Sequence, residues 1–219
     1  MKKDFTEIVC ILDRSGSMGT VRNDAIHGFN TFLADQKKVP GTAKLTIVMF
    51  DDQYEVPVNG CDIQHVEALN EKTYVPRGMT ALHDAMGKAI DDLGARLAKT
   101  PEHERPERVI IVTLTDGQEN HSKEFTGSMV KEKIEHQTNK YNWTFMFLAA
   151  GQDAILTASN LGIAKGFTAN YVNDSRGLNF AYSAVSSAVG SFRKCGLVDS
   201  DWKANLEPDD PNEKKQEKK

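Results

Sequence analysis

Cysteine is scarce in this chain of 219 residues. The three that occur, Cys10, Cys61 and Cys195, form no CxxC pair. An odd number of cysteines at unrelated spacings is the pattern of neither a disulfide framework nor a thiolate metal site. Cys10 lies inside the apolar run 8–12, where a cysteine acts as a small core residue. We therefore expect reduced thiols.

Long apolar runs are also lacking. No run approaches the roughly 20 residues that a membrane helix requires. The apolar run that follows the first lysines is too short for a secretory signal. We therefore expect a cytoplasmic protein that does not contact a membrane.

Positive charge is not in excess, because 27 lysines and arginines face 31 acidic residues, for a formal net charge of −4. No basic patch interleaved with aromatic residues occurs either. Attraction to phosphates needs clustered positive charge. Nucleic acid is therefore not an expected partner.

The common catalytic motifs are missing as well. The chain has no GxSxG elbow, no P-loop and no GxGxxG, and its 6 histidines form no HxH or HExxH pair. Nucleophilic catalysis thus lacks its parts. We expect a protein that is not an enzyme.

Short apolar runs alternate with longer amphipathic segments, which is typical of an α/β fold with a largely parallel sheet. Pro57 predicts that its strand lies at an edge, as the one antiparallel strand. We assign residues 1–198 to one domain and 199–219 to a charged tail that is expected to be disordered. Strands are predicted at 7–12, 44–50, 54–58, 108–114, 143–150 and 167–172, and helices at 21–38, 80–97 and 178–192.

Oxygen-bearing side chains follow these elements in three loops. Asp13, Ser15 and Ser17 come after the first strand, Thr80 opens the second helix, and Asp116 follows the strand 108–114. Sites in open parallel sheets form at the carboxyl ends of the strands, so these loops can meet on one rim. Hydroxyls and carboxylates are ligands that Mg²⁺ accepts. With mostly neutral ligands, the ion would keep enough charge to attract a further carboxylate.

Several residues near these loops have more ordinary interpretations. Thr80 also fits the N-cap of a helix. Asp84 is expected to complement the helix dipole or to anchor a backbone amide rather than to bind the metal. Arg14 and Arg77 are expected to point outward, either into solvent or toward a partner's carboxylate. The Asp-Asp pair at 51–52 is interpreted as turn chemistry.

The DRSGS loop at 13–17, the GMT loop at 78–80 and the TDG loop at 115–117 together resemble von Willebrand factor type A domains over residues 6–193. The resemblance implies a Rossmann-like sheet of about six strands, with one antiparallel edge strand and helices on both faces. Short bacterial and phage proteins of this family look similar. The resemblance also implies a metal-ion-dependent adhesion site with Mg²⁺, or alternatively Mn²⁺ or Ca²⁺, held by Asp13, Ser15, Ser17, Thr80 and Asp116, partly through water.

The function implied by the resemblance is Mg²⁺-dependent binding of an Asp or Glu side chain on a partner protein, as an adaptor in a larger complex. A metal-dependent hydrolase of phosphate esters is an alternative, because Asp with Mg²⁺ at a strand end is also a phosphotransfer arrangement. Against it, Ser15 stands where such enzymes usually carry a second carboxylate. A structural subunit with a non-essential site is the other alternative. The partner and the oligomeric state are not determined by the sequence.

Overall fold

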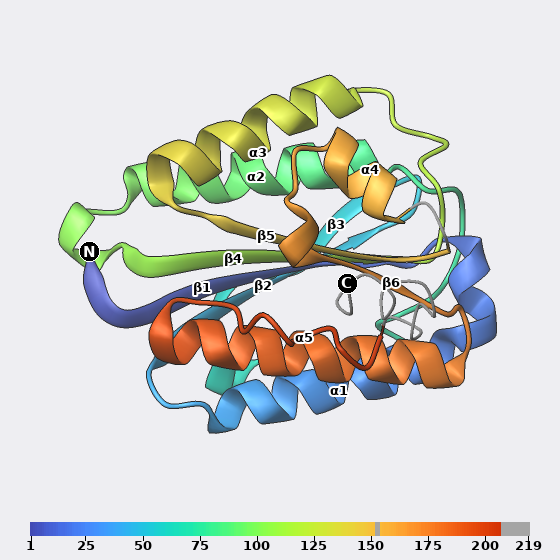
Figure 1. Ribbon diagram of the computed structural model, residues 1–219, viewed down its shortest axis with the longest axis horizontal. Helices are drawn as coiled ribbons and strands as arrows, with labels where there is room; N and C mark the ends of the chain where they lie inside the picture. The colour runs from blue at the N-terminus through green and yellow to red at the C-terminus, as the bar shows by residue number, and fades with distance from the viewer. Residues whose placement is uncertain (152–153, 207–219) are drawn as a thin grey trace, which may run out of the picture.

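Six apolar segments of the chain form the strands of a single sheet, with helices packed on both of its faces (Figure 1). The computed structural model describes residues 1–151 and 154–206. Short 3₁₀ turns η1 (Gly16–Val21), η2 (Ile63–His65), η3 (Glu102–Glu104) and η4 (Lys165–Phe167) join some of the elements. The strands and helices are β1 (Lys2–Asp13), α1 (Arg22–Lys38), β2 (Thr42–Phe50), β3 (Tyr54–Asp62), α2 (Leu82–Lys99), β4 (Pro106–Thr115), α3 (Gly127–Tyr141), β5 (Thr144–Ala150), α4 (Ala154–Asn160), β6 (Thr168–Tyr171) and α5 (Ser175–Cys195).

The strand order is β3-β2-β1-β4-β5-β6. All neighbouring strands are parallel except β3, which runs antiparallel to β2 at one edge. Pro57 lies in β3, where its missing N–H does not interrupt a central ladder. The predicted α/β fold is therefore confirmed: it is a Rossmann-like sheet with one antiparallel edge strand.

The sheet separates two hydrophobic cores, because successive side chains of a strand point to opposite faces. In β1, Ile8, Cys10 and Leu12 pack with α1 and α5, whereas Val9 and Ile11 pack with α2, α3 and α4. Figure 1 shows the two helical layers on either side of the sheet. Each fully buried aliphatic side chain contributes about 1.5–3 kcal/mol, so the long apolar run of β1 stabilises both layers. Cys10 is 2% exposed, as expected of a core residue.

Two helices, α3 and α4, were not among the predicted elements. In α3 only Val130 and Ile134 are buried, and the remaining residues are mostly charged or polar. Two apolar positions one turn apart are too few to establish a helical period. The sequence features that could have indicated α3 lie at its ends. Thr126 caps the first turn by accepting from the N–H of Met129, and Asn142 ends the helix in the left-handed region with φ 55°.

The packed part of the chain extends beyond the predicted domain end at residue 198. Residues 200–206 form turns that place Trp202 and Leu206 against the core, where they are 5% and 8% exposed. The indole N–H of Trp202 donates to the carbonyl of Gly166 at 2.8 Å. These two apolar side chains thus pack against the core from a mostly polar segment. The rest of the predicted tail, residues 207–219, lies outside the described residues.

Among residues 1–151 and 154–206, no helix combines the length and the apolar character that are needed to cross a membrane.

Candidate metal centre

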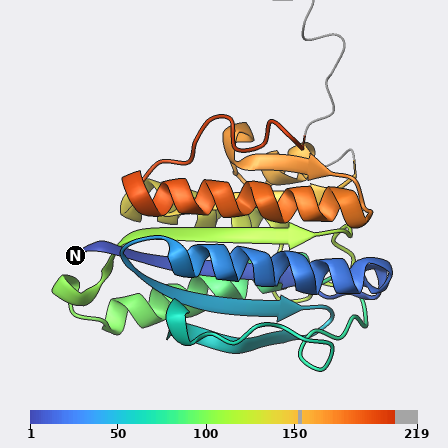
Figure 2. The same cartoon turned by 90° about the horizontal axis from the view of Figure 1, so that it is seen from below.

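The carboxyl ends of β1 and β4 lie next to each other, because the two strands are parallel neighbours with Leu12 opposite Leu114. Asp13 is the last residue of β1, and Asp116 comes directly after β4. In Figure 2 the arrowheads of the parallel strands point toward the end of the molecule where η1 lies. The chain leaves β1 toward β2 on one side, whereas β4 leads to β5 on the other. A crevice at such a switch point is the usual ligand site of an open α/β sheet.

Oxygen atoms of four predicted ligands lie close together on this rim. The Oγ atoms of Ser15 and Ser17 are 3.1 Å apart, and the Ser17 hydroxyl donates to Oδ1 of Asp116 at 2.6 Å. Oδ1 of Asp13 accepts the backbone N–H of Ser15 at 2.7 Å, which fixes the carboxylate beneath the serines. The fold thus joins residues that are 99 positions apart in the chain.

Thr80 reaches the same rim from the irregular segment 66–81. Its N–H donates to Oδ1 of Asn120 at 2.9 Å, and its carbonyl accepts the N–H of Asn120 at 3.1 Å. A Cβ atom at Gly117 would lie 3.0 Å from Oγ1 of Thr80, so the glycine leaves room for the hydroxyl. The N-cap of α2 is Ala81, without a side-chain hydrogen bond. The alternative interpretation of Thr80 as the N-cap is therefore wrong.

The carboxylate of Asp13 is only 1% exposed. Burial raises its pKa to about 6, although the hydroxyl of Thr115 and the Ser15 N–H stabilise the charged form, and the nearby charge of Asp116 raises the pKa further. An ionised carboxylate in this position lacks a compensating positive charge within its own hydrogen-bond set. A bound cation would supply that charge.

Three side chains that the sequence did not single out hold this rim in place. The Tyr74 hydroxyl donates to the backbone carbonyl of Asp13, and the Tyr171 hydroxyl donates at 2.9 Å to the carbonyl of the last residue of β4. The side-chain amide of Asn173 donates to Oδ2 of Asp116 at 3.1 Å. Each contact spans more than fifty positions of the chain, so no local sequence pattern signals it.

The spacing of the oxygens fits a hard divalent cation. Adjacent ligands of an octahedral Mg²⁺ ion, each 2.0–2.1 Å from the metal, lie roughly 2.9 Å from one another. The Ser15–Ser17 and Ser17–Asp116 oxygen pairs, at 3.1 Å and 2.6 Å, bracket that value. Hydroxyls and carboxylates are also the donor types that such ions prefer.

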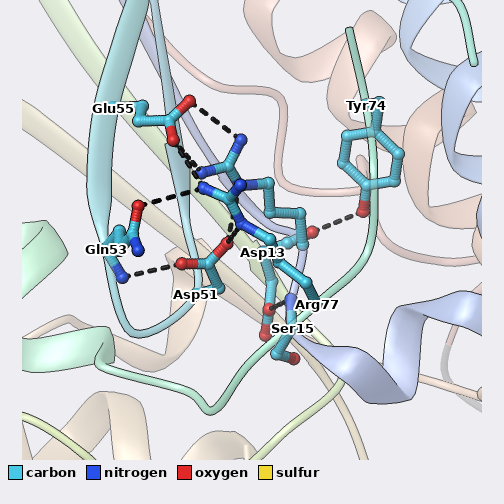
Figure 3. Close-up of polar contacts among 8 residues, drawn as sticks. Asp13, Ser15, Asp51, Gln53, Glu55, Tyr74 and Arg77 are labelled. Carbon is cyan, nitrogen blue, oxygen red and sulfur yellow. Dashed lines mark hydrogen bonds and ion pairs between the residues drawn. The ribbon is translucent and has the colours of Figure 1, made fainter. Parts of the chain in front are cut away.

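Arg14 does not point outward, contrary to the expectation from sequence, and the half-exposed Arg77 is paired with acidic side chains of this chain (Figure 3). Arg14 is 4% exposed, and its Nε donates to Oδ2 of Asp51 at 2.9 Å. Nε of Arg77 donates to the same oxygen at 2.9 Å. Both guanidinium groups also pair with Glu55, and this lowers the pKa of that carboxylate. Oδ1 of Asp51 accepts the N–H of Gln53, which is the expected turn chemistry, but the ion pairs were not predicted.

Asp84 anchors the segment that follows Asp116, which is one of the two roles expected of it. Its carboxylate accepts the backbone N–H groups of Lys123, Glu124 and Phe125 at 2.9, 2.9 and 2.7 Å. Burial alone raises the pKa of Asp84, but these three hydrogen bonds outweigh it, so the pKa is lowered. Asp84 thereby steadies the loop that carries Asn120, the partner of Thr80.

In the part of the chain that the structure describes, no group of three or more His, Cys, Asp or Glu side chains could hold a metal ion. The rim instead offers two carboxylates together with hydroxyls, so its donor set is one of hard oxygens rather than of imidazole or thiolate.

Fold and rim together define the class of protein as a Rossmann-like α/β domain with clustered hydroxyl and carboxylate oxygens at the switch point of the sheet. The sequence pattern of the von Willebrand factor type A domain matches residues 8–118, just over half of the 219 residues, and the chain belongs to this family. Domains of this family typically mediate protein–protein interactions. No curated protein was matched by sequence.

Solved structures share the fold at low sequence identity. Proximal thread matrix protein 1 from the mussel byssus, solved with a zinc-occupied MIDAS motif, is 16% identical with a TM-score of 0.58, over 84% of this chain and 46% of the mussel chain. The manganese-loaded TRAP protein of Plasmodium vivax is 16% identical with a TM-score of 0.55, over 78% and 70%. BatB from Bacteroides thetaiotaomicron is 15% identical with a TM-score of 0.53, over 86% and 99%. The chain thus spans just under half of the mussel protein.

Proposed function

We propose that this domain is a Mg²⁺-dependent module that recognises an acidic side chain of a partner protein. The observation that carries the proposal is the contact of Ser17 with both Ser15 and Asp116, with the Thr80 hydroxyl lying beside Gly117. The structures of the mussel protein with zinc and of the Plasmodium protein with manganese support it. The residues proposed to hold the ion are Asp13, Ser15, Ser17, Thr80 and Asp116.

Each of these side chains has a defined task in the proposal. The hydroxyls of Ser15, Ser17 and Thr80 offer neutral oxygens. Asp13 and Asp116 supply negative charge, and Asp13 is held from beneath by Thr115. The bound ion supplies an electrostatic attraction for a carboxylate, because neutral ligands leave much of its charge uncompensated.

Because the arginines next to the rim are already paired, they leave the binding of a partner's carboxylate to depend more on the metal ion. Both guanidinium groups are paired with Asp51 and Glu55, so neither is committed to capturing an incoming acid. The half-exposed Met79 beside Thr80 and the exposed Val172 beside Asn173 are apolar. In our proposal, attraction for the partner's carboxylate therefore rests mainly on the ion.

Other parts of the proposal rest on the sequence alone. These are the preference for Mg²⁺ over other divalent ions, the adaptor role in a larger complex, the cytoplasmic location and the bacterial or phage type of the chain. The assignment of residues 1–198 to the domain and 199–219 to a tail also came from the sequence alone, and the burial of Trp202 and Leu206 favours a boundary after residue 206 instead.

Metal binding is tested first, by titrating Mg²⁺ and Mn²⁺ into the metal-free protein in a calorimeter. We expect the wild type to bind both ions and Asp116→Ala to lose at least about tenfold in affinity, since a carboxylate next to the ion is removed. Glu119→Ala is not a suitable control, because Glu119 holds the neighbouring loop. Asp52→Ala, in an exposed turn position, is the better control.

Recognition of an acid is tested with a random peptide library displayed on phage, bound in Mg²⁺ and eluted with a chelator. We expect the enriched peptides to share an Asp or Glu whose change to Asn or Gln abolishes binding, as does Ser17→Ala in the domain. Peptides that bind equally well with the chelator present, or that need no acidic residue, would contradict the proposed function.

A further inference from the structure

We propose that Asp51 is a positioning residue of the metal centre. It sets the distance between the loop that carries Ser15 and Ser17 and the loop that carries Thr80. The inference rests on the proposed function, because it concerns the same five ligands. It assigns a role in metal affinity to a residue that lies outside the set of ligands and outside the sequence motif.

Asp51 comes directly after β2, and its side chain is fully buried, at 0% exposure. Its hydrogen bonds are local or run to the two ligand loops. Oδ2 accepts from Nε of Arg14 and from Nε of Arg77, each at 2.9 Å, while Oδ1 accepts from the N–H of Gln53 at 2.7 Å. One carboxylate oxygen thus accepts from two arginines at once. Figure 3 shows Asp51 with Gln53 and Arg77.

The two arginines lie in the loops that carry the proposed metal ligands. Arg14 stands between Asp13 and Ser15, and Arg77 stands three positions before Thr80. A side chain that holds both therefore links two groups of ligands that come from separate parts of the chain. Because Asp51 is completely buried, its bonds to Arg14 are shielded from water, where charge-assisted hydrogen bonds are stronger.

Backbone hydrogen bonds run alongside this ionic link. The N–H of Arg77 donates to the carbonyl of Arg14 at 2.8 Å, and the N–H of Gly16 donates to the carbonyl of Gly78 at 3.2 Å. The N–H of Ala81 donates to the carbonyl of Asp51 at 2.9 Å. The Thr80 loop is therefore held on both sides of Thr80, and the buried side chain of Asp51 accepts from the arginines of both loops.

The close approach of the loops also requires a glycine. Gly78 has φ +65°, and a Cβ atom there would lie 2.2 Å from Oδ1 of Asp52 and 3.5 Å from Cβ of Asp51. The Thr80 loop thus passes directly over the turn that carries Asp51. A loop that crosses this turn so closely will shift if the buried carboxylate below it loses its charge.

Glu55 contributes less to this link. Its side chain is 46% exposed, as is that of Arg77, so the pair between them is largely screened by water. Arg14 approaches Glu55 with Nη1 at 3.0 Å and with Nη2 at 2.7 Å, the latter without hydrogen-bond geometry. Asp51 is the partner that both arginines share in a buried position.

The experiment compares Asp51→Asn with Asp52→Asn, the same substitution at the next position of the same turn, where the side chain is exposed. Mn²⁺ and Mg²⁺ are titrated into each metal-free protein at a temperature at which both remain folded. We expect Asp51→Asn to weaken metal affinity by about tenfold or more, as substitutions of residues that orient metal ligands do, and Asp52→Asn to change it by less than about twofold.

Two further variants separate positioning from loss of stability. Val130→Ala removes a fully buried side chain of α3, a helix that carries none of the proposed ligands, and lowers stability. We expect it to bind metal like the wild type. Arg77→Ala, at a half-exposed position, is used if Asp51→Asn does not fold, and it is expected to weaken metal affinity because it releases the Thr80 loop from Asp51.

Hydrogen exchange of the metal-free proteins supplies a readout that does not depend on the ion. We expect the amides of Gly16, Arg77 and Ala81 to exchange faster in Asp51→Asn than in the wild type and in Asp52→Asn. Unchanged metal affinity in both Asp51→Asn and Arg77→Ala, with wild-type binding intact, overturns the positioning role alone. A wild type that binds neither ion overturns both this inference and the proposed function.

Discussion

At the scale of the single residue, Asp13 shows how a binding site and a stable fold make opposite demands. Its carboxylate is buried, and burial raises its pKa to about 6. The folded, metal-free protein therefore holds the Asp13 proton more tightly than the unfolded chain, where the pKa is 3.8. The stability that follows is complete below pH 3.8 and is lost as the pH rises through about 6.

We therefore expect Asp13→Asn to stabilise the metal-free protein at pH 7.5 by about 1–3 kcal/mol, since an uncompensated buried charge is removed. The Thr115 hydroxyl can turn to donate to the carbonyl of Gly117, 3.1 Å away, and accept from the new amide. Urea unfolding in chelator from pH 4 to pH 8 measures the effect, and the gap between the two proteins is expected to close toward pH 4. A variant less stable than the wild type at pH 7.5 contradicts it.

At the scale of the element, the first turn of α2 organises the loop after β4. Asp84 accepts three backbone N–H groups of residues 123–125, and these bonds lower its pKa against the effect of burial. The loop has no regular structure of its own, so its N–H groups depend on this carboxylate. Sequence could assign Asp84 to anchoring an amide because a first-turn acid often does so, but it could not say which amides.

We expect Asp84→Asn to destabilise the protein by about 1–3 kcal/mol at pH 7, because one amide cannot accept from three donors as a carboxylate does. A lowered pKa contributes stability above the unfolded value of 3.8 that is lost as the pH falls through the lower folded value. The difference from the wild type should therefore shrink below about pH 3.8. Urea unfolding across pH 2.5–7 measures it.

The matched control on the same helix is Asp91→Asn. The Asp91 side chain is 52% exposed and pairs with Lys133 at 2.6 Å, a surface ion pair of small net value. We expect a change below about 1 kcal/mol for this control. Equal losses in the two variants would show that the backbone contacts of Asp84 are not what stabilises the loop.

At the scale of the whole molecule, the packed structure extends farther toward the C-terminus than the composition of this segment indicates. Trp202 covers the core beside η4 and donates to Gly166, and Leu206 adds a second buried contact. The average polarity of the segment did not predict that these two residues are buried, because burial depends on individual side chains and not on the mean hydropathy of a window.

We expect a chain that ends at residue 198 to unfold with a free energy lower by about 3–5 kcal/mol than the full chain, since a buried tryptophan and a leucine are lost. A chain that ends at residue 206 keeps both and should remain within about 1 kcal/mol of the full chain. Thermal and urea unfolding of the three proteins measure this. Equal stability of the two truncated chains would instead support the boundary at 198.

The sequence by itself determined the fold class, because hydrophobic periodicity records which face of each strand and helix is buried. It also determined which loops lie at the carboxyl edge of the sheet, since in a parallel sheet a loop's place follows from the strand it succeeds. It did not indicate α3, whose buried face consists of Val130 and Ile134.

Only the tertiary structure decided how Arg14 and Arg77 are used, and that Tyr74, Tyr171 and Asn173 hold the rim. The physical reason is the range of these contacts. The ion pairs of Arg14 and Arg77 with Asp51 form only where the loops that carry them meet in space. The local sequence around an arginine does not indicate whether its side chain will be solvated or buried.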